Sequence, residues 1–342
     1  MSDFAIFLID ALVKSVIIIA MLLTGFAYTT LLERRFIAAL QSRIGPNRAG
    51  PLGLLQPVAD GVKLFFKEDI VPKNADKVIF TLAPVLVAVP ALIVMAVVPL
   101  GSQVNVFGHV TNLGLADVNV GVLYILAVTS IAVYGVALAG WASANKFAMM
   151  GGLRASAQMI SYELALGLTV LVPVMMAGSM SLGAIIEAQK GLWYIVVQPI
   201  AGIIFYMTLL AEVNRAPFDL PEAEQELVAG YHTEYSGMKF AGFYMGEYIK
   251  MIAVSAIFAS LYLGGYQFFG LENLLGGWMG FFIISGKIVA SLMFMVWVRA
   301  TLPRFRYDQV MALGWKILLP IALLNVAVTM VLIVLGVFPV AL

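Results

Sequence analysis

The chain has 342 residues, of which 62% are apolar and only 11% are charged, and its mean hydropathy is +0.99. This composition lies outside the range of soluble globular domains and predicts that lipid is the natural solvent of the protein. The net charge of +1 gives no basic or acidic bias, which excludes nucleic acid as an expected partner. With no cysteine and two histidines, the chain cannot bind an iron–sulfur cluster through thiolates, so any redox centre belongs to a partner.

Apolar stretches long enough to cross a bilayer recur along the whole sequence. A spanning helix needs about 20 mostly apolar residues, and about eight such stretches predict an all-α polytopic membrane protein. The first stretch ends on Glu33, Arg34 and Arg35 and has no basic residue before it, which favours a retained helix over a cleaved signal peptide. The expected spans are residues 4–32, 78–100, 118–140, 158–177, 192–211, 245–263, 278–298 and 316–338.

Basic residues are concentrated in alternate connections between these spans. The first connection carries eight Lys and Arg residues, and the second carries none. By the positive-inside rule, this bias places the odd-numbered connections in the cytoplasm and both termini on the non-cytoplasmic side. No repeat or flexible linker divides the chain, so we expect one transmembrane helical domain over residues 1–342, with long structured cytoplasmic loops.

Small residues and prolines within the predicted spans indicate how the helices pack. Gly242 and Gly246 have the GxxxG spacing that lets two helix backbones approach closely. Pro84 and Pro173 lie inside spans, where kinks are tolerated because neighbouring helices satisfy the freed backbone groups. We therefore expect a closely packed bundle with bent helices.

The first cytoplasmic connection is long and rich in Gly, Pro and Arg. Its second half has a helical apolar period and is expected to lie along the membrane surface or beneath a docked partner. Arg34 and Arg35 fit two interpretations equally well, a flank of the spanning helix and a binding role. The apolar face of the predicted helix consists of Leu54, Leu55, Val58, Val62 and Phe65.

The third cytoplasmic connection is unusually acidic. It has six acids within 23 positions of a chain that contains 19 acids in total. Mutual repulsion and partial desolvation near lipid suit such groups for proton exchange near neutral pH. Asp219 and Glu222 fit a helix cap equally well, but capping does not account for the others. The six acids are Glu212, Asp219, Glu222, Glu224, Glu226 and Glu234.

Ionisable residues also lie within or beside the predicted spans. Glu163, Glu212 and Glu247 occupy such positions, and charged groups at membrane depth usually face the bundle interior and mark a polar pathway. Lys250 and Lys287 can pair with these acids, although Lys250 fits a snorkelling role equally well. These positions predict a buried polar path.

The last cytoplasmic loop interleaves three arginines with aromatic residues. Phe305 and Tyr307 alternate with Arg304 and Arg306, and Arg299 precedes them. Guanidinium groups stack and form paired hydrogen bonds, so this loop is expected to contact a polar partner surface.

Taken together, these segments resemble one family, the H-type subunit of proton-pumping NADH:quinone oxidoreductase, respiratory complex I. Residues 53–63, with Gln56 and Asp60, resemble its first signature, and residues 217–230 resemble its second. Residues 43–47 and 299–309 also match, so the resemblance covers essentially the whole chain.

The resemblance implies a multi-pass subunit of the bacterial cytoplasmic (inner) membrane. It implies docking against the peripheral arm, whose subunits contain FMN and iron–sulfur clusters, and contact with small membrane subunits and lipid. Quinone, either ubiquinone or menaquinone, is the implied substrate. The subunit is expected to supply the wall of the quinone chamber and the start of an acidic channel that couples quinone reduction to proton pumping.

The resemblance also implies a role for individual positions. Carried over residue by residue, quinone binding falls on Arg34, Arg35, Arg43, Asp60, Phe218, Asp219, Glu222, Glu224 and Glu226. The proton channel falls on Glu163, Glu212, Glu234 and Glu247. Partner contact is expected at Arg299, Arg304 and Arg306. Quinol formation is expected to change the charge around residues 219–226 and thereby shift the protonation of Glu212 and Glu163.

Two other functions fit parts of the sequence. The homologous membrane subunit of a membrane-bound hydrogenase or ferredoxin-linked complex shares much of the acidic loop, but the long first loop argues against it. A stand-alone secondary transporter is expected to show internal repeats around broken helices, and the sequence contains no obvious repeat.

Overall fold

Long apolar helices make up most of the chain, because only a helix satisfies its own backbone hydrogen bonds in lipid. The structure, a computed structural model, describes residues 3–106, 109–221, 224–272 and 277–338. Among these residues, six helical segments are long and apolar enough to cross a membrane. They are α1 (Asp3–Leu40), α3 (Lys77–Val94), α4 (Gly121–Ala142), α5 (Lys146–Ala177), α11 (Trp278–Thr301) and the continuous helix formed by α12 (Tyr307–Ala312), a π-helical turn (Leu313–Leu318) and α13 (Leu319–Val334). The structure therefore confirms a polytopic helical membrane protein.

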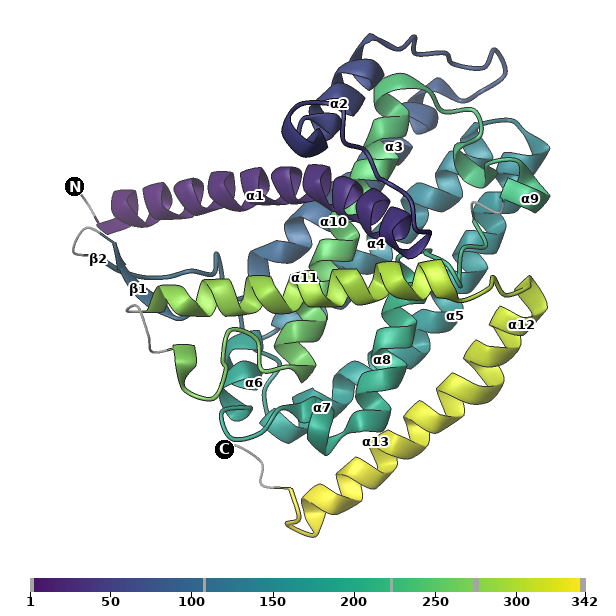
Figure 1. The fold of residues 1–342 in the computed structure, drawn as a ribbon. Coiled ribbons are helices and arrows are strands. Elements are labelled where there is room, and N and C mark those ends of the chain that lie inside the picture. Colours follow the sequence, from purple (N-terminus) through teal and green to yellow (C-terminus); the bar gives the residue numbers. More distant parts are fainter. Residues whose placement is uncertain (1–2, 107–108, 222–223, 273–276, 339–342) are drawn as a thin grey trace.

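Two further helices occupy the remaining predicted spans. α8 (Pro199–Glu212) has 14 residues, which gives a length of about 21 Å against the roughly 30 Å of a hydrocarbon layer. α10 (Gly237–Tyr262) has 26 residues and carries three charged side chains, Lys239, Glu247 and Lys250. Both helices lie within the bundle (Figure 1). Eight membrane crossings stay a prediction.

The bundle has two distinct ends. At one end lie α2 (Gln56–Phe66), α9 (Glu224–Leu227) and α12, and we call it the loop side (Figure 1). At the other end, the hairpin side, α1 begins and α13 ends (Figure 1). The hairpin side also carries the antiparallel strands β1 (Gln103–Val106) and β2 (His109–Asn112), and the short helices α6 (Leu182–Ala188) and α7 (Tyr194–Val197).

Three local features differ from the sequence-based expectation. α5 begins at Lys146 and not at residue 158, because the Asn145 side chain caps its first turn by accepting from Phe147 N at 2.9 Å. The fifth predicted span is broken at Gln198, the residue before Pro199, which separates α7 from α8. The β-hairpin was not predicted, since four-residue strands carry little periodic signal.

Small residues bring α10 and α3 into close contact, as the GxxxG spacing predicted. A Cβ atom on Gly246 would lie 2.8 Å from Val87 Cγ1 and 3.2 Å from Ala88 Cα. A Cβ atom on Gly242 would lie 3.1 Å from Pro84 Cβ. The two glycines therefore allow the helix backbones to pack together without intervening side chains.

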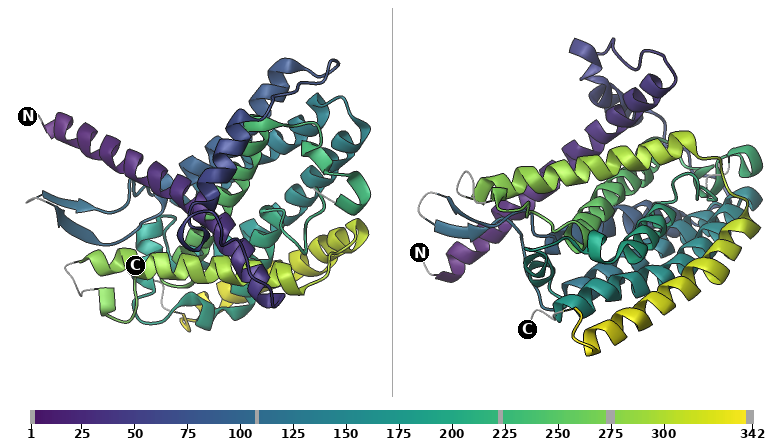
Figure 2. Two further views of the ribbon diagram at one scale, coloured as in Figure 1. Left: turned by 45° about the horizontal axis from the view of Figure 1, so that its top comes forward. Right: turned by 60° about the horizontal axis from the view of Figure 1, so that its bottom comes forward.

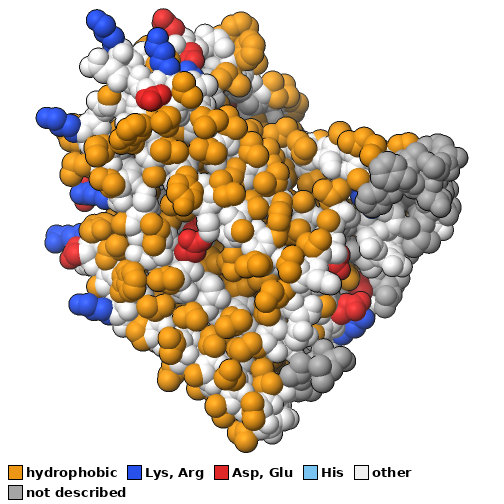
Figure 3. All heavy atoms as spheres, turned by 180° about the vertical axis from the view of Figure 1, so that it is seen from behind, with side chains coloured by type: hydrophobic (Ala, Val, Ile, Leu, Met, Phe, Trp, Pro, Cys, Tyr) orange, Lys and Arg blue, Asp and Glu red, His pale blue; other side chains and the backbone are white. Residues whose placement is uncertain are grey.

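α1 and α13 lie on the outside of the bundle (Figure 2). In the most apolar stretch of α1 only 11% of the residues are buried within this chain, and in that of α12–α13 only 17% are buried. Figure 3 shows a broad surface of apolar side chains with most charged side chains along its edges, as expected of a surface in contact with hydrocarbon. Val58, Val62 and Phe65 on α2 are more than half exposed, so the apolar face of this helix also lacks a partner within the described chain.

Lys287 of α11 closes the last turn of α10. Its ammonium group donates to the carbonyl oxygens of Leu263, Gly265 and Gln267 at 2.6, 2.8 and 2.6 Å. It also lies 4.6 Å from the centre of the Trp193 ring. Lys287 therefore has a capping role, and its hydrogen bonds go to carbonyl oxygens and not to the membrane-depth acids that the sequence suggested.

Candidate functional site

A cluster of buried charges joins three helices at the loop side. Arg215, which follows α8, has its Nε atom 2.6 Å from Glu247 Oε1 on α10 and its NH1 atom 3.6 Å from Glu33 Oε1 on α1. Arg299 of α11 donates to the same Glu33 oxygen. The guanidinium carbon of Arg215 lies 4.5 Å from the centre of the Tyr248 ring. Two acids and two bases thus form a neutral cluster, as burial away from water requires.

The third connection packs under the bundle and is not a solvated loop. Phe218 and Leu220 are 2% and 3% exposed. The Phe218 ring lies 5.4 Å from Tyr162 of α5 and 5.7 Å from Phe305. Phe305 N donates to Pro217 O at 3.2 Å, which ties the last connection to this segment. Arg215 and Asp219 are therefore held on an ordered backbone.

A second buried ion pair lies deeper in the bundle. Lys250 Nζ is 2.7 Å from Glu212 Oε1, and the side chains are 9% and 6% exposed. Lys250 therefore pairs with an acid, which decides between the two interpretations that its sequence position left open. Glu212 is the last residue of α8, and Lys250 lies in the middle of α10. The ion pair therefore links these two helices.

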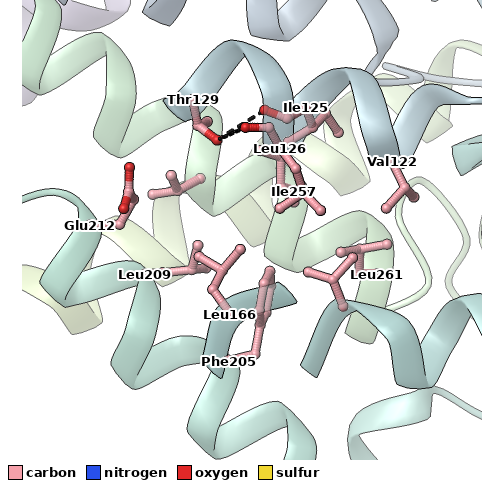
Figure 4. A pocket seen from close by; sticks show the side chains of 12 residues that line it. Val122, Ile125, Leu126, Thr129, Leu166, Phe205, Leu209, Glu212, Ile257 and Leu261 are labelled. Atoms are coloured by element: carbon pink, nitrogen blue, oxygen red, sulfur yellow. Dashed lines mark hydrogen bonds between the residues drawn. The ribbon is translucent and has the colours of Figure 1, made fainter. Parts of the chain in front are cut away.

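Two small cavities flank this pair. One, of about 20 Å³, reaches Glu212 and is lined mainly by apolar side chains of α4, α5, α8 and α10, as Figure 4 shows. The other, of about 10 Å³, is lined by Lys250 and lies against α3, α4 and α10. Thr129 and Val254 line both. Each volume is close to that occupied by a single water molecule, roughly 10–15 Å³ on the same measure.

The remaining predicted channel acids occupy different environments. Glu163 of α5 is partly buried and accepts a hydrogen bond from Ser130 of α4. Glu234 accepts from Asn145 Nδ2 at 2.5 Å and lines a polar surface pocket of about 420 Å³. Burial raises the pKa of the adjacent Tyr235 phenol, which therefore stays protonated at neutral pH. Glu212 and Glu247 thus lie inside the bundle, whereas Glu163 and Glu234 are only partly buried.

The first connection is held to the end of α1 by polar contacts. Arg34 NH1 lies 2.6 Å from Asp60 Oδ2, and Gln56 Nε2 donates to Asp60 Oδ1 at 3.2 Å. The Arg34–Asp60 contact holds α2 beside the last turns of α1, and the Gln56–Asp60 hydrogen bond lies within α2. Arg43 is exposed and donates to Gln41 Oε1 at 2.7 Å, and Arg35 is partly buried.

The predicted acidic-loop residues whose side chains the structure describes occupy different environments. Asp219 is partly buried next to Phe218, whereas Glu226 is exposed and lies 2.5 Å from Arg154 NH1. Glu222 lies outside the described residues, as does the side chain of Glu224.

The three arginines predicted to contact a partner also differ from one another. Arg299 turns inward to Glu33 and its side chain is 33% exposed. Arg304 is partly buried. Arg306 is exposed at the start of α12, where it remains available to a partner.

An apolar cleft leads toward the buried cluster from the side of the bundle. It lies between α1 and α11, has a volume of about 250 Å³, and is lined almost entirely by apolar side chains, with Tyr28, Thr29 and Ser285 as the polar exceptions. Leu32, at one end of the lining, directly precedes Glu33.

Sequence reasoning missed several residues of this site. Glu33 entered only as the flank of the first span, although a continuous helix places it in line with Leu22 and Thr29 at spacings of seven and four. Both of those residues are buried, at 3% and 6% exposure. Arg215 stood beside the acidic run but was not assigned a role. Within the described part of the chain, no group of three or more His, Cys, Asp or Glu side chains is placed to hold a metal ion.

Comparison with known proteins identifies the family. The chain matches the family model described as NADH dehydrogenase over residues 13–330. It is 51% identical over 319 residues to an H-type subunit of NADH-quinone oxidoreductase from Geobacter metallireducens, which covers 93% of this chain and 94% of that protein. It is 53% identical over 316 residues to an H-type subunit of NADH-quinone oxidoreductase from Syntrophobacter fumaroxidans, covering 92% of this chain and 93% of the relative. The chain therefore belongs to the NADH dehydrogenase family, in the branch whose members are named as H-type subunits of NADH-quinone oxidoreductase.

Proposed function

We propose that this chain is the membrane subunit of proton-translocating NADH:quinone oxidoreductase that supplies the wall of the quinone chamber and the start of an acidic proton channel. This proposal rests on two neighbouring groups of buried charged residues. Glu33, Arg215 and Glu247 form the first group at the loop side. Glu212 and Lys250 form the second group, deeper in the bundle. Buried charges at membrane depth are costly and mark functional pathways.

The quinone is the substrate, and the electrons come from partner subunits. The names of the relatives state the quinone reaction, and all the relatives compared carry the same subunit name, which favours this function over a hydrogenase or ferredoxin-linked complex. FMN and iron–sulfur clusters belong to the peripheral arm. The chain crosses the bacterial inner membrane eight times, with the loop side in the cytoplasm, where the basic residues lie.

An apolar quinone reaches the site from the bilayer. Its isoprenoid tail requires an apolar passage, and the cleft between α1 and α11 offers one that ends beside Glu33. Its polar headgroup requires hydrogen-bond partners, and Arg34, the residue after Glu33, offers one together with Asp60 of α2, with which it is paired. The buried Phe218 and the partly buried Asp219 supply a further part of the chamber wall in this proposal.

Quinone reduction takes up two electrons and two protons. The cluster around Arg215 is neutral, so the gain or loss of one proton leaves one buried charge without a compensating charge. This change favours movement of Arg215 between Glu33 and Glu247. Glu212, three residues before Arg215, then exchanges its proton through the flanking cavities, and Glu163 follows. Each cavity has about the volume of one water molecule, and the polar side chains that line the two cavities are Glu212, Lys250 and Thr129.

The test is a pumping measurement on the intact complex in vesicles. Glu212→Gln and Glu163→Gln are expected to lower the number of protons pumped per NADH oxidised, because an amide cannot exchange a proton. Asn105→Ala, on the exposed hairpin, is the matched control and is expected to pump normally. Full pumping in both Gln variants would refute the proposal.

A further inference from the structure

Gln158 of α5 has the least exposed polar side chain beside the candidate site. It is 0% exposed and lies between the end of α8 and the third connection. Its Nε2 group donates to Ala211 O at 2.8 Å, to Phe218 O at 2.8 Å and to Asn214 Oδ1 at 3.2 Å. Two of these partners are carbonyl oxygens, which only accept, so the amide nitrogen and not the amide oxygen faces them.

The three acceptors share one property. Each belongs to the residue directly before a charged residue of the site: Ala211 before Glu212, Asn214 before Arg215, and Phe218 before Asp219. One amide group on α5 therefore holds the backbone directly before Glu212 and Asp219, and it contacts the side chain of the residue before Arg215.

The backbone turns sharply here. Asn214 has a φ of +57°, a left-handed conformation that is uncommon outside glycine and that asparagine adopts more readily than most other residues. The turn between α8 and Phe218 contains four backbone hydrogen bonds: Val213 N to Leu209 O at 3.1 Å, Asn214 N to Ala211 O at 3.2 Å, Arg215 N to Leu210 O at 3.4 Å and Phe218 N to Arg215 O at 2.9 Å. Gln158 connects the two ends of this turn.

We infer that Gln158 is a positioning residue that sets the geometry of Glu212, Arg215 and Asp219 for quinone reduction and its coupling to proton transfer. The inference rests on the proposed function, because it assigns Gln158 a role in that same site. Gln158 carries no charge and exchanges no proton. It acts through the backbone that it holds.

Two near-isosteric variants separate this role from simple packing. Gln158→Met fills the same space without a donor, and Gln158→Glu keeps the shape but donates only when its carboxyl group is protonated. Thr169→Val is the matched control, because Thr169 is also buried on α5 but its hydroxyl group bonds only to Ala165 O and Leu166 O of its own helix.

The measurement is NADH:quinone activity of the assembled complex against pH, beside NADH oxidation with a water-soluble acceptor that bypasses the quinone. A small displacement of reacting groups lowers rates by roughly ten- to a hundredfold, and we expect a loss of that order in quinone activity for Gln158→Met. The bypass activity and the Thr169→Val variant are expected to stay at the native level. Gln158→Glu is expected to recover relative to the native protein as the pH falls, since burial favours its protonated, donating form.

Three outcomes would overturn the inference: native quinone activity in Gln158→Met, an equal loss in Thr169→Val, or the same relative pH profile in the Glu and Met variants. If Gln158→Met does not assemble, Gln158→Glu is compared with the native protein alone, and a ratio of their activities that does not change with pH overturns the inference. These outcomes are separate from the pumping test, because loss of quinone activity in the Gln158 variants can occur whether or not Glu212→Gln and Glu163→Gln pump normally.

Discussion

A charged side chain is tolerated inside this apolar bundle where a partner of opposite charge is close enough to replace water. Glu212 and Lys250 meet this condition at 2.7 Å, and Arg215 meets it with Glu247 at 2.6 Å. Glu163 differs, because its hydrogen-bond donor is the neutral hydroxyl group of Ser130. Of the three membrane-depth acids, Glu163, Glu212 and Glu247, Glu163 is therefore the one for which the described residues provide no ion pair.

Removal of one member of the deep pair should be worse than removal of both. Lys250→Met leaves the Glu212 carboxylate without its partner, which costs roughly 3–5 kcal/mol of stability for a buried pair. The double variant Lys250→Met, Glu212→Gln is expected to recover much of this loss. Thermal unfolding of the assembled complex measures both.

The matched control is an ion pair at the rim of the same helix. Lys239 lies 2.9 Å from the half-exposed Asp69, and Lys239→Met is expected to cost no more than about 1 kcal/mol. Equal losses in Lys250→Met and the double variant would contradict the assignment of Lys250 as a charge partner.

The sequence predicted the charged residues of the site better than it predicted their connections. Glu163, Glu212 and Glu247 stand out because an acid in an apolar run is rare, and the structure buries Glu212 and Glu247 and partly buries Glu163. Glu33 was missed because it lies at a span end, where charge is ordinary. Gln158 gives no sequence signal, since its role depends on three acceptors more than 50 positions away.

Helix limits differ from hydropathy limits wherever polar residues continue a helix beyond the lipid. Most predicted spans coincide with helices, because a long apolar run has one stable form in a bilayer. α5 extends toward the loop side beyond its apolar stretch, because the start of the helix is defined by the capping residue Asn145 and not by hydropathy. The break at Gln198 follows from the proline after it, which lacks the backbone donor that a continuous helix needs.

The contact between α10 and α3 offers a test at the level of the helix pair. Gly246→Ala places a methyl group against the Ala88 backbone, where overpacking costs roughly 1–3 kcal/mol, and the thermal midpoint of the complex is expected to fall. Gly167→Ala on α5 is the control, because a Cβ atom there meets nothing within 4 Å. This control is expected to be neutral or stabilising by up to about 1 kcal/mol through helix propensity. The same change in both variants would contradict the packing role of Gly246.

Over the whole molecule, the distribution of charge determines the expected orientation in the membrane. The chain contains no cysteine, so a single introduced cysteine can report which side a residue faces by reaction with a membrane-impermeant thiol reagent. Asn47→Cys on the loop side is expected to react from the cytoplasmic face alone, and Asn105→Cys on the hairpin side from the opposite face alone. Identification of the labelled peptide separates this chain from its partners. Reaction of both positions from one face would contradict the proposed arrangement.

The three hydrogen bonds that Lys287 donates to backbone carbonyl oxygens affect how protons can move through the bundle. An ammonium group whose three hydrogens are all donated to the backbone is poorly placed to pass a proton onward. Among the described residues, the fully buried carboxylates, Glu33 and Glu212, lie at the loop-side ends of α1 and α8. Among the described residues, the half of the bundle nearer the hairpin therefore offers no fully buried carboxylate as a proton carrier. Under the proposed function, protons that reach Glu212 are expected to leave through a neighbouring subunit and not through this half of the chain.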